Sequence, residues 1–371
     1  MLQAIPEFFR TIAAFVVVLG VLVFVHELGH YLAARWMGVH IETFSIGFGR
    51  KIFGWTDRRG TAWRVSWIPL GGFVRLHGQE RAEDVADADR ALWQPGRTFQ
   101  EKSVARRAVV IAAGPVANFL LAMVLFTALF ALAGRPVATA TIGDVVAGGP
   151  AERAGLLKGD RIDSIDGTLT PRFDDLQRIV VAHPGQTLSL VVHRGDANQT
   201  MTATPDSRDD GHGKMVGLLG IRSGGSVFER LSPGDAVVAG VTQTWDVTVQ
   251  TLAGVGQMIS GSRGTDDLGG PLRIAQLSGE VAQLGLASLV SFIAVLSVNL
   301  GLINLFPIPI LDGGHLLFYL IEALRGRPLP PRAQEYGFRA GFALLAGLFV
   351  FATWNDLSHL GLVKWVAGLI G

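Results

Sequence analysis

Four long runs of apolar residues, separated by polar stretches, dominate the pattern of this chain. None of the four runs contains a charged side chain; they are Thr11–Val25, Ala108–Leu132, Val281–Leu311 and Ala340–Asn355. A helix needs about 20 mostly apolar residues to cross a bilayer. The pattern therefore predicts four membrane-spanning helices, at about 8–36, 108–132, 284–306 and 340–358.

The polar stretches between these runs predict further structure. A Pro-Leu-Gly-Gly turn with alternating apolar and polar flanks predicts a β-hairpin at about 61–76 that dips into the membrane. The central stretch, 135–225, combines strand patterns with Gly-containing turns and one helical pattern, which is typical of a small α+β domain. Its expected elements are strands at 140–146 and 187–194 and a helix at 174–181. Apolar residues at helical spacing within 226–280 predict a linker along the membrane surface, and the acidic 80–97 predicts an exposed loop.

The predicted fold is a polytopic α-helical membrane protein with a membrane-associated β-hairpin and an inserted α+β domain. The N-terminal membrane core is expected at 1–134 and the C-terminal one at 281–371. Lys and Arg are concentrated in the two polar connections that join the first to the second run and the third to the fourth. The positive-inside rule therefore predicts these connections in the cytoplasm and the central domain outside. The first run has no basic start and leads into charged residues, which predicts a retained span rather than a signal peptide.

Composition narrows the function classes. The 371 residues include 32 Lys plus Arg and 31 Asp plus Glu, a net charge of +1 that argues against a nucleic-acid binder relying on overall charge. Charged residues make up 17% of the chain, against about 25% on average. Together with the clustered apolar runs, this excludes a disordered protein and an ordinary water-soluble enzyme. The absence of Cys excludes disulfides, Cys-based zinc sites and thiol nucleophiles.

The first run ends in a motif with metal-binding chemistry, His26-Glu27-Leu-Gly-His30. Residues four apart share one face of a helix, so both imidazoles can bind the same cation, and His nitrogen suits Zn²⁺. Glu27 lies beside the pair and can take a proton from a metal-activated water. A chance match to so short a motif is the alternative. Ionisable residues at bilayer depth are costly, however, and usually mark a functional site.

Two His leave a catalytic zinc one protein ligand short. The candidate for the third ligand is Asp312, which follows Pro307 and Pro309 at the end of the third apolar run. The two prolines break the helix, and an unwound segment within a membrane is tolerated where it lines a cavity. An Asp that only caps the next helix is the alternative. Asn304 is expected to bond an extended substrate, unless it only links helices, and His315 is expected either to support the site or to pack.

The second run contains Ala113-Gly114-Pro115-Val-Ala-Asn118, where small residues interrupt larger apolar ones. Small residues allow close helix contact, so Gly114 and Pro115 predict a packing face beside the helix that carries the two His. Asn118 is expected to support the site, by packing or by direct contact. The remaining His residues show no ligand spacing and are interpreted as surface or structural groups: His40, His77, His183, His193, His212 and His359.

The segments 26–30, 113–118 and 304–314, in this order on separate spans, resemble the site-2 protease family (M50) of intramembrane zinc metalloproteases. The sub-group to which the chain is similar is the bacterial regulator-of-sigma-E protease type, and 148–167 resembles a bacterial PDZ domain. The enterobacterial form has two tandem PDZ domains, whereas this chain has room for one.

The resemblance implies that one Zn²⁺ is held by His26, His30 and Asp312, with Glu27 as the general base. The segment Trp67–Val74 would correspond to the family's re-entrant β-element. Within that element, the substrate-binding residues would be Gly71, Gly72 and Phe73.

The resemblance also implies the partners. The enzyme would act in regulated intramembrane proteolysis on single-span membrane proteins. Such substrates are anti-sigma-factor-like proteins trimmed by an upstream site-1-type protease, or remnant signal peptides. The location would be the bacterial plasma (inner) membrane, with the active site near the cytoplasmic side and the PDZ-like domain filtering substrates outside. No nucleic acid is expected. The alternatives are a non-catalytic PDZ scaffold in the membrane and a zinc transporter.

Overall fold

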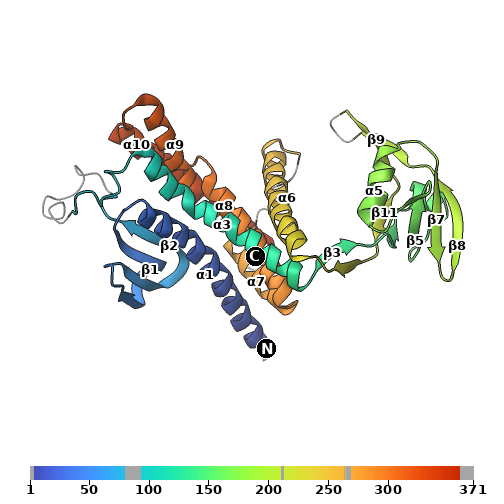
Figure 1. Cartoon of the computed structure of the whole chain (residues 1–371), viewed down its shortest axis with the longest axis horizontal. Coiled ribbons are helices and arrows are strands. Elements are labelled where there is room, and N and C mark those ends of the chain that lie inside the picture. Colours follow the sequence, from blue (N-terminus) through green and yellow to red (C-terminus); the bar gives the residue numbers. More distant parts are fainter. Residues whose placement is uncertain (1–3, 80–92, 210–212, 263, 265–268, 360–371) are drawn as a thin grey trace, which may run out of the picture. The chain divides into compact units, whose positions relative to one another are not determined.

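The computed structural model describes residues 4–79, 93–209, 213–262, 264 and 269–359. The chain divides into two compact units, one made of Met1–Leu129 and Gly234–Gly371, the other of Phe130–Pro233 (Figure 1). The first unit contains most of the helices: α1 (Ala4–Trp36), α3 (Val104–Leu132), α6 (Pro233–Ile259), α7 (Pro271–Gln283), α8 (Leu286–Leu305), α9 (Asp312–Arg325) and α10 (Pro331–His359). It also contains two long strands, β1 (Ile41–Thr56) and β2 (Ala62–Leu76).

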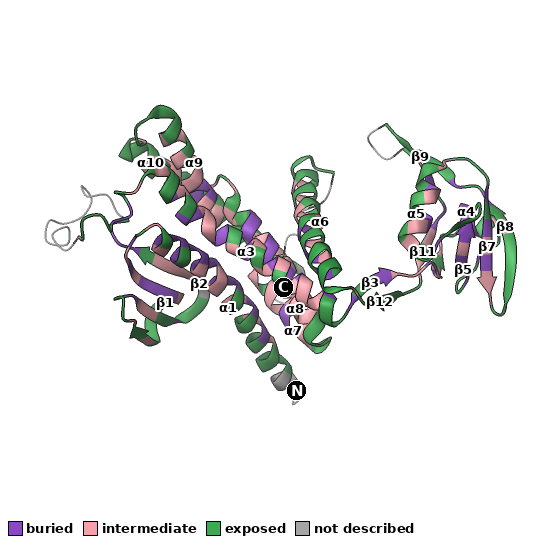
Figure 2. Ribbon diagram, in the orientation of Figure 1, coloured by how far each residue is buried: buried purple, intermediate pink, exposed green. Residues whose placement is uncertain are grey.

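Four of the described helices are long and apolar enough to cross a membrane: α1, α3, α8 and α10. The four expected spans fall on these helices, and α10 begins before the apolar run that predicted it. Much of their apolar surface is exposed in the chain alone (Figure 2), and only 6% of the most apolar window of α10 is buried. Exposed apolar surface of this extent is what lipid covers in a membrane protein. The protein is therefore a multi-pass membrane protein.

Two buried clusters hold the first unit together. The first joins α1, α3 and α8 through Val18, Leu22 and Ile293, with leucines of α3 packed against them. The second lies where the C-terminal half of α1 meets the sheet and the start of α3; its members include Tyr31, Phe44, Leu76, Phe99 and Val110. This second cluster fixes the sheet against the part of α1 that carries the His-Glu-x-x-His motif.

The sheet differs from the predicted hairpin. Strands β1 and β2 pair along their length, and in the register Ser45 of β1 is opposite both Phe73 and Arg64 of β2. The two arms beside the Pro-Leu-Gly-Gly turn thus pair with β1, and the expectation that they pair with each other was wrong. The segment that became β1 was missed because glycines interrupt its alternation. At Gly47 the φ angle is +84° and a Cβ would lie 2.6 Å from the carbonyl oxygen of Ile68, so the bend requires glycine.

The helix α6 packs along the first unit through a stripe of small residues. Its buried positions, Ala236, Gly240, Thr244 and Val247, recur at helical spacing. Gly240 lies directly against Thr127 and Met123 of α3. On the same helix, the hydroxyl of Thr251 donates to Asn299 of α8 at 2.9 Å. These contacts show which face of α6 meets protein; that its other face lies on the membrane surface remains a prediction. The expected acidic loop falls mostly outside the described residues.

The second unit is built on a four-stranded sheet in the order β6-β5-β7-β8. Its elements are β3 (Arg135–Ala138), β4 (Ile142–Val145), α4 (Pro150–Arg153), β5 (Arg161–Ile165), β6 (Thr168–Leu169), α5 (Phe173–Ala182), β7 (Leu188–Arg194), β8 (Ala197–Ala203), β9 (Asp206–Asp209), β10 (Met215–Leu218), β11 (Ile221–Ser223) and β12 (Ser226–Glu229). The strands and helix expected in this stretch correspond to β4, β7 and α5.

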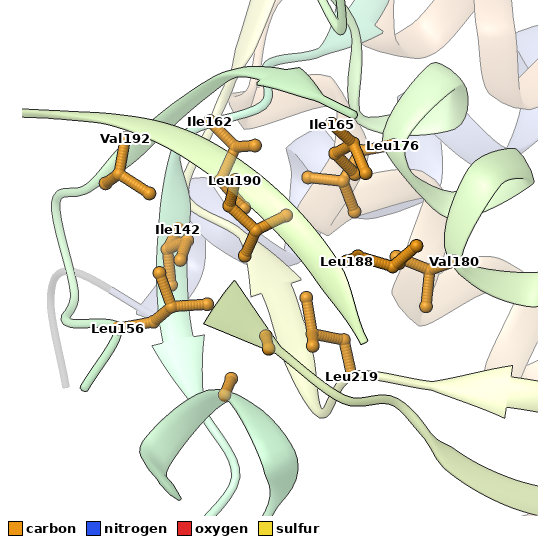
Figure 3. Packing of buried hydrophobic residues seen from close by; sticks show 12 residues of the cluster. Ile142, Leu156, Ile162, Ile165, Leu176, Val180, Leu188, Leu190, Val192 and Leu219 are labelled. Carbon is orange, nitrogen blue, oxygen red and sulfur yellow. The ribbon is translucent and has the colours of Figure 1, made fainter. Parts of the chain in front are cut away.

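The core of the second unit is a single apolar cluster (Figure 3). Leu188, Leu190 and Val192 alternate along β7 and point into it, and Leu176 and Val180 of α5 close it from one side. The chain enters and leaves this unit through a two-stranded ribbon in which β3 pairs with β12. The unit is therefore an α+β insertion with its own core.

Candidate active site

The helix α1 carries three polar side chains in an otherwise apolar segment. His26, Glu27 and His30 are each only 9% exposed. The two imidazoles lie one turn apart on the same face, and their Nε2 atoms are 3.2 Å from each other. An unpaired polar group at this depth is costly, so the arrangement points to a shared ligand between the two rings.

A tight turn brings a carboxylate to the same place. The helix α8 ends at Leu305, and α9 begins at Asp312. Between them the backbone of Ile310 has φ +95°, a conformation that a β-branched residue rarely adopts. The start of α9 folds back closely on the turn, since Gly313 lies against the carbonyls of Leu305 and Phe306. The expected helix break and the helix after Asp312 are both present.

Three ligating atoms meet at this point. Oδ2 of Asp312 lies 3.1 Å from Nε2 of His26 and 3.4 Å from Nε2 of His30. Zinc–ligand bonds of about 2.0–2.2 Å in a tetrahedron place neighbouring ligand atoms about 3.3–3.6 Å apart. This Oδ2 is buried and forms no hydrogen bond with any described residue. His26, His30 and Asp312 therefore fit one zinc ion, which satisfies the carboxylate oxygen.

The remaining ring nitrogens have partners on α3. Nδ1 of His30 lies 2.9 Å from the carbonyl oxygen of Val110, to which it donates, so its Nε2 carries the lone pair that a metal needs. Nδ1 of His26 lies 3.1 Å from the side-chain amide of Asn118. The end of that amide nearer to the ring is Nδ2, and Oδ1 of Asn118 is buried without a partner among the described residues. Exchanging the two ends of the amide, which have nearly the same shape, lets Oδ1 accept from Nδ1 of His26 and leaves Nε2 free to bind a metal. The expected contact of Asn118 with the site is direct.

Small residues of α3 leave room for the imidazoles. A Cβ on Gly114 would overlap the ring of His30 and lie 2.9 Å from Cε1 of His26. Gly29 of α1 lies equally close to Ala113 of α3. Pro115 lies inside α3, where it removes one backbone donor. The segment 113–118 therefore combines close helix packing with an amide that reaches the site.

The second arm of β2 lies against Glu27. A Cβ on Gly72 would lie 3.0 Å from Cγ of Glu27, and the backbone of Val74 lies near the Glu27 carboxylate. Gly71 has φ +93°, and a Cβ there would meet the ring of Phe48. Phe73 stacks on the same ring of Phe48, with centroids 6.1 Å apart. Gly72 is thus the member of the predicted substrate element that lies directly beside the glutamate.

Asn304 and His315 form no hydrogen bond to the side chains of His26, His30 or Asp312 in the described part of the chain. The amide of Asn304 donates to the carbonyl of Leu300, one turn back on α8, at 3.0 Å. His315 packs on the ring of Phe338, with centroids 5.4 Å apart, so its contact is a packing one. His212 and the side chain of His359 lie outside the described residues.

Sequence reasoning missed an ion pair that anchors the two ligand-bearing regions. Arg107 at the start of α3 donates to Glu322 of α9 at 2.6 Å, and its guanidinium lies 4.9 Å from the ring centre of Tyr319. Both charged side chains are largely buried. Their separation of more than 200 residues along the chain gives no local signal. The pair fixes α9, and with it Asp312, against α3.

Two imidazoles and a carboxylate around one point, with a buried glutamate beside them, define a metal-dependent hydrolase set among membrane-crossing helices. The model of peptidase family M50 matches residues 14–348. The chain belongs to this family and is a zinc metalloprotease. The two alternative functions, a non-catalytic PDZ scaffold in the membrane and a zinc transporter, are therefore not supported.

Relatives over nearly the whole chain carry names of the same kind. A Rhizobium meliloti protein named "Putative zinc metalloprotease" is 44% identical, covering 94% of this chain and 97% of its own. An Agrobacterium fabrum protein also named as a putative zinc metalloprotease is 43% identical, covering 94% of this chain and 96% of its own. Metalloprotease MmpA of Caulobacter vibrioides is 39% identical over 95% and 96%.

Two similar solved structures each overlap only a part of the chain. The PDZ domain of an SdrC-like protein from Listeria monocytogenes matches 23% of this chain and 87% of its own, with 22% identity and a TM-score of 0.20. A score this low carries no argument about the central domain, and its likeness to a PDZ domain remains a prediction from the motif.

Proposed function

We propose that this zinc metalloprotease cleaves membrane-spanning segments of single-span proteins, with His26, His30 and Asp312 as the zinc ligands and Glu27 as the general base. One observation carries the proposal. The three ligating atoms and the Glu27 carboxylate are buried together among helices whose outer surfaces are apolar. A soluble protease has no need of such surroundings, whereas a substrate that lies in the bilayer can reach them laterally.

The chain's own residues account for proton transfer. Zinc, when bound, supplies a Lewis acid that activates water and polarises the scissile carbonyl. Glu27 then takes a proton from the attacking water and passes it to the leaving nitrogen. The 72–74 backbone of β2 lies beside this carboxylate. The amide of Asn118 and the carbonyl of Val110 orient the two imidazoles.

The second arm of β2 is suited to hold the substrate. A helical substrate keeps its carbonyls in its own hydrogen bonds, so a stretch of it must unwind before cleavage. Strand addition to the 72–76 arm replaces the lost bonds beside Glu27. Phe73→Pro is expected to abolish cleavage, whereas Phe73→Ala keeps the backbone donor and retains most of it. Equal activity of the two variants contradicts strand addition.

The substrates and the orientation are also part of the proposal. The arginine-rich connections favour a cytoplasmic position for the C-terminal end of α1, and so for the active site. The expected location is the bacterial plasma membrane, with the second unit outside the cytoplasm. Suitable substrates are single-span proteins of the anti-sigma-factor kind after trimming by a site-1-type protease, or remnant signal peptides.

The decisive experiment uses the full chain reconstituted in liposomes with a tagged single-span substrate. Glu27→Gln is expected to lose cleavage by at least ~1,000-fold while retaining about one zinc per chain, because general-base catalysis and water activation depend on this carboxylate. Glu7→Gln is the matched control on the exposed N-terminal part of the same helix. Full activity of Glu27→Gln contradicts the proposed base.

A deletion tests the proposed filter. Ala138 and Ser226 are paired in the ribbon of β3 and β12, so a short Gly-Ser linker can close the chain after removal of 139–225. If the second unit excludes untrimmed substrates, the shortened enzyme cleaves intact ones. Loss of all cleavage, with zinc still bound, indicates instead that this unit docks the substrate.

A further inference from the structure

A pocket that the proteolytic site does not use lies just after the end of α1. It has a volume of about 500 Å³, within the range of about 300–1,000 Å³ typical of small-molecule sites. Its lining includes four arginines and a histidine, contributed by three separate segments: Arg35, His40, Arg58, Arg59 and Arg97. Such a group of cations in one hollow calls for a counter-charge.

The described residues do not supply that counter-charge. None of the four guanidinium groups is within 4.0 Å of a carboxylate in the described part of the chain. Arg35 donates to the hydroxyl of Tyr31 at 3.1 Å and Arg97 to the amide oxygen of Gln94 at 3.0 Å, both uncharged partners.

Asp57 acts electrostatically on Arg35, and Glu42 on His40, but both carboxylates form their hydrogen bonds and ion pairs with other groups. Asp57 accepts from the backbone amides of Arg59 and Thr61 and from the indole of Trp63. Glu42 pairs with Arg75 at 3.2 Å and with His77 at 2.8 Å. The hollow therefore keeps a positive potential.

The state of His40 agrees with this. Its partial burial, the neighbouring His77 and the charge of Arg97 all hold the pKa of His40 below its ordinary value. Partial burial is the main reason that a further proton is disfavoured on His40, and the nearby charges of Arg97 and Arg35 add to it.

The pocket adjoins the end of the first candidate membrane span. The apolar span ends at Trp36, whose side chain is 79% exposed. Trp55, near the turn that carries Arg58 and Arg59, is 54% exposed. Exposed Trp at the end of a span marks the membrane–water interface, and basic clusters beside a span attract anionic lipids.

We propose that this pocket binds the phosphate group of an anionic phospholipid headgroup. Planar guanidinium groups from the end of α1, the turn after β1 and the 93–97 segment can each offer paired N–H donors to phosphate oxygens. Lipid is favoured over a soluble anion because Arg35, which lines the hollow, lies at the apolar end of a candidate span. The ligand class is thus a phosphodiester or phosphomonoester anchored by acyl chains.

The test measures lipid binding to the purified full chain in mild detergent by native mass spectrometry. Phosphatidylglycerol and phosphatidylcholine are titrated separately, and sodium phosphate is added as a third arm. The variant Arg58→Gln/Arg59→Gln removes two exposed cations of the pocket. The matched control Arg50→Gln/Lys51→Gln removes the same charge from exposed positions on β1 outside the pocket.

The expected result is one phosphatidylglycerol bound at least ~10-fold more tightly than phosphatidylcholine. Each basic residue near an anionic surface contributes about fivefold, so the pocket variant is expected to weaken this binding about 25-fold. The control changes it less than about twofold. Arg97→Gln, from a different segment, is expected to weaken it about fivefold and guards against a local folding defect of the turn.

Four outcomes overturn the proposal. The first is equal binding of the two lipids. The second is an equal loss of binding in the pocket variant and the control, which indicates unspecific charge attraction; the third and fourth indicate a different occupant of the pocket. Phosphate alone binding as tightly as the lipid indicates a soluble anion. In the last outcome, phosphatidylglycerol binds more tightly than phosphatidylcholine only after the acidic side chains of the 80–89 stretch are replaced by amides. That result indicates that this stretch is the occupant. The replaced residues are Glu80, Glu83, Asp84, Asp87 and Asp89.

Discussion

Replacing Gly114 with alanine tests the packing on which the zinc site depends. In most helices this change is favourable by about 0.5–1 kcal/mol because alanine loses less backbone entropy. At this position the added methyl group overlaps the ring of His30 and lies 2.9 Å from Cε1 of His26. Carbon atoms in contact normally keep about 3.5–4.0 Å. Unless α3 shifts, the ring of His30 must therefore move by roughly 1 Å or more, and that of His26 by roughly 0.5–1 Å.

A displacement of this size is incompatible with the ligand geometry. Metal–ligand distances vary by only about 0.2 Å, so the displaced imidazole no longer binds. The overlap can also be relieved if α3 moves away from α1. The 2.9 Å hydrogen bond from His30 to the carbonyl of Val110 resists that movement. We expect Gly114→Ala to weaken zinc binding at least ~100-fold and to abolish proteolysis, with the chain still folded.

The assay is zinc content by mass spectrometry after equilibration with chelators of graded affinity, beside a thermal unfolding curve in detergent. Gly20→Ala is the matched control, since a Cβ at Gly20 of α1 has no neighbour within 4 Å. The control is expected to bind zinc as the wild type does. If Gly114→Ala also binds zinc with wild-type affinity, the proposed ligand set or its contact with α3 is wrong.

Three further predictions concern residues that support the two units. Asn118→Ala is expected to weaken zinc affinity about 10–100-fold, measured by chelator competition, because it leaves one imidazole unoriented; Asn118→Asp restores an acceptor and most of the affinity. Arg107→Gln or Glu322→Gln is expected to lose about 3–5 kcal/mol of stability, whereas the joint Met replacement is nearer neutral, measured by unfolding in detergent. Arg194 holds the pKa of Asp160 below its ordinary value of 3.8. Because that pKa is depressed on folding, this stabilisation is present above about pH 4 and lost as the pH falls below it. Asp160→Asn should speed hydrogen exchange of β7 at pH 7, and by progressively less as the pH falls below 3.8.

The sequence predicted the parts of the fold that depend on local pattern. Apolar runs of sufficient length gave the four spans, because the bilayer leaves a backbone few other solutions. The sheet was harder to predict, since Gly47 and neighbouring glycines bend β1 and hide its alternation. The pairing of Ser45 with both arms of β2 depends on contacts between distant segments, which periodicity along one segment does not record.

The site shows the same division. The spacing of His26 and His30 follows from helix geometry, and the chemistry of zinc called for a third ligand elsewhere. The contact of Asp312 with these two residues depends on the tertiary structure, and so do the hydrogen-bond partners of the ring nitrogens. Asn118 was identifiable only as a polar group on a small-residue face, and the role of Val110 resides in a backbone carbonyl that no sequence motif marks.

The turn before Asp312 explains why the third ligand needs so specific a segment. Local preference opposes this turn, because a β-branched residue at φ +95° costs about 1–3 kcal/mol. Such a cost persists only when the surroundings impose it. Here the start of α9 lies against the carbonyls that end α8, and Gly341 of α10 lies against Pro309. Two helices thus hold the turn in a conformation that it would not adopt alone. That constraint directs the carboxylate of Asp312 at the two imidazoles, so the rigidity of the metal site is supplied by helix packing rather than by the ligands themselves.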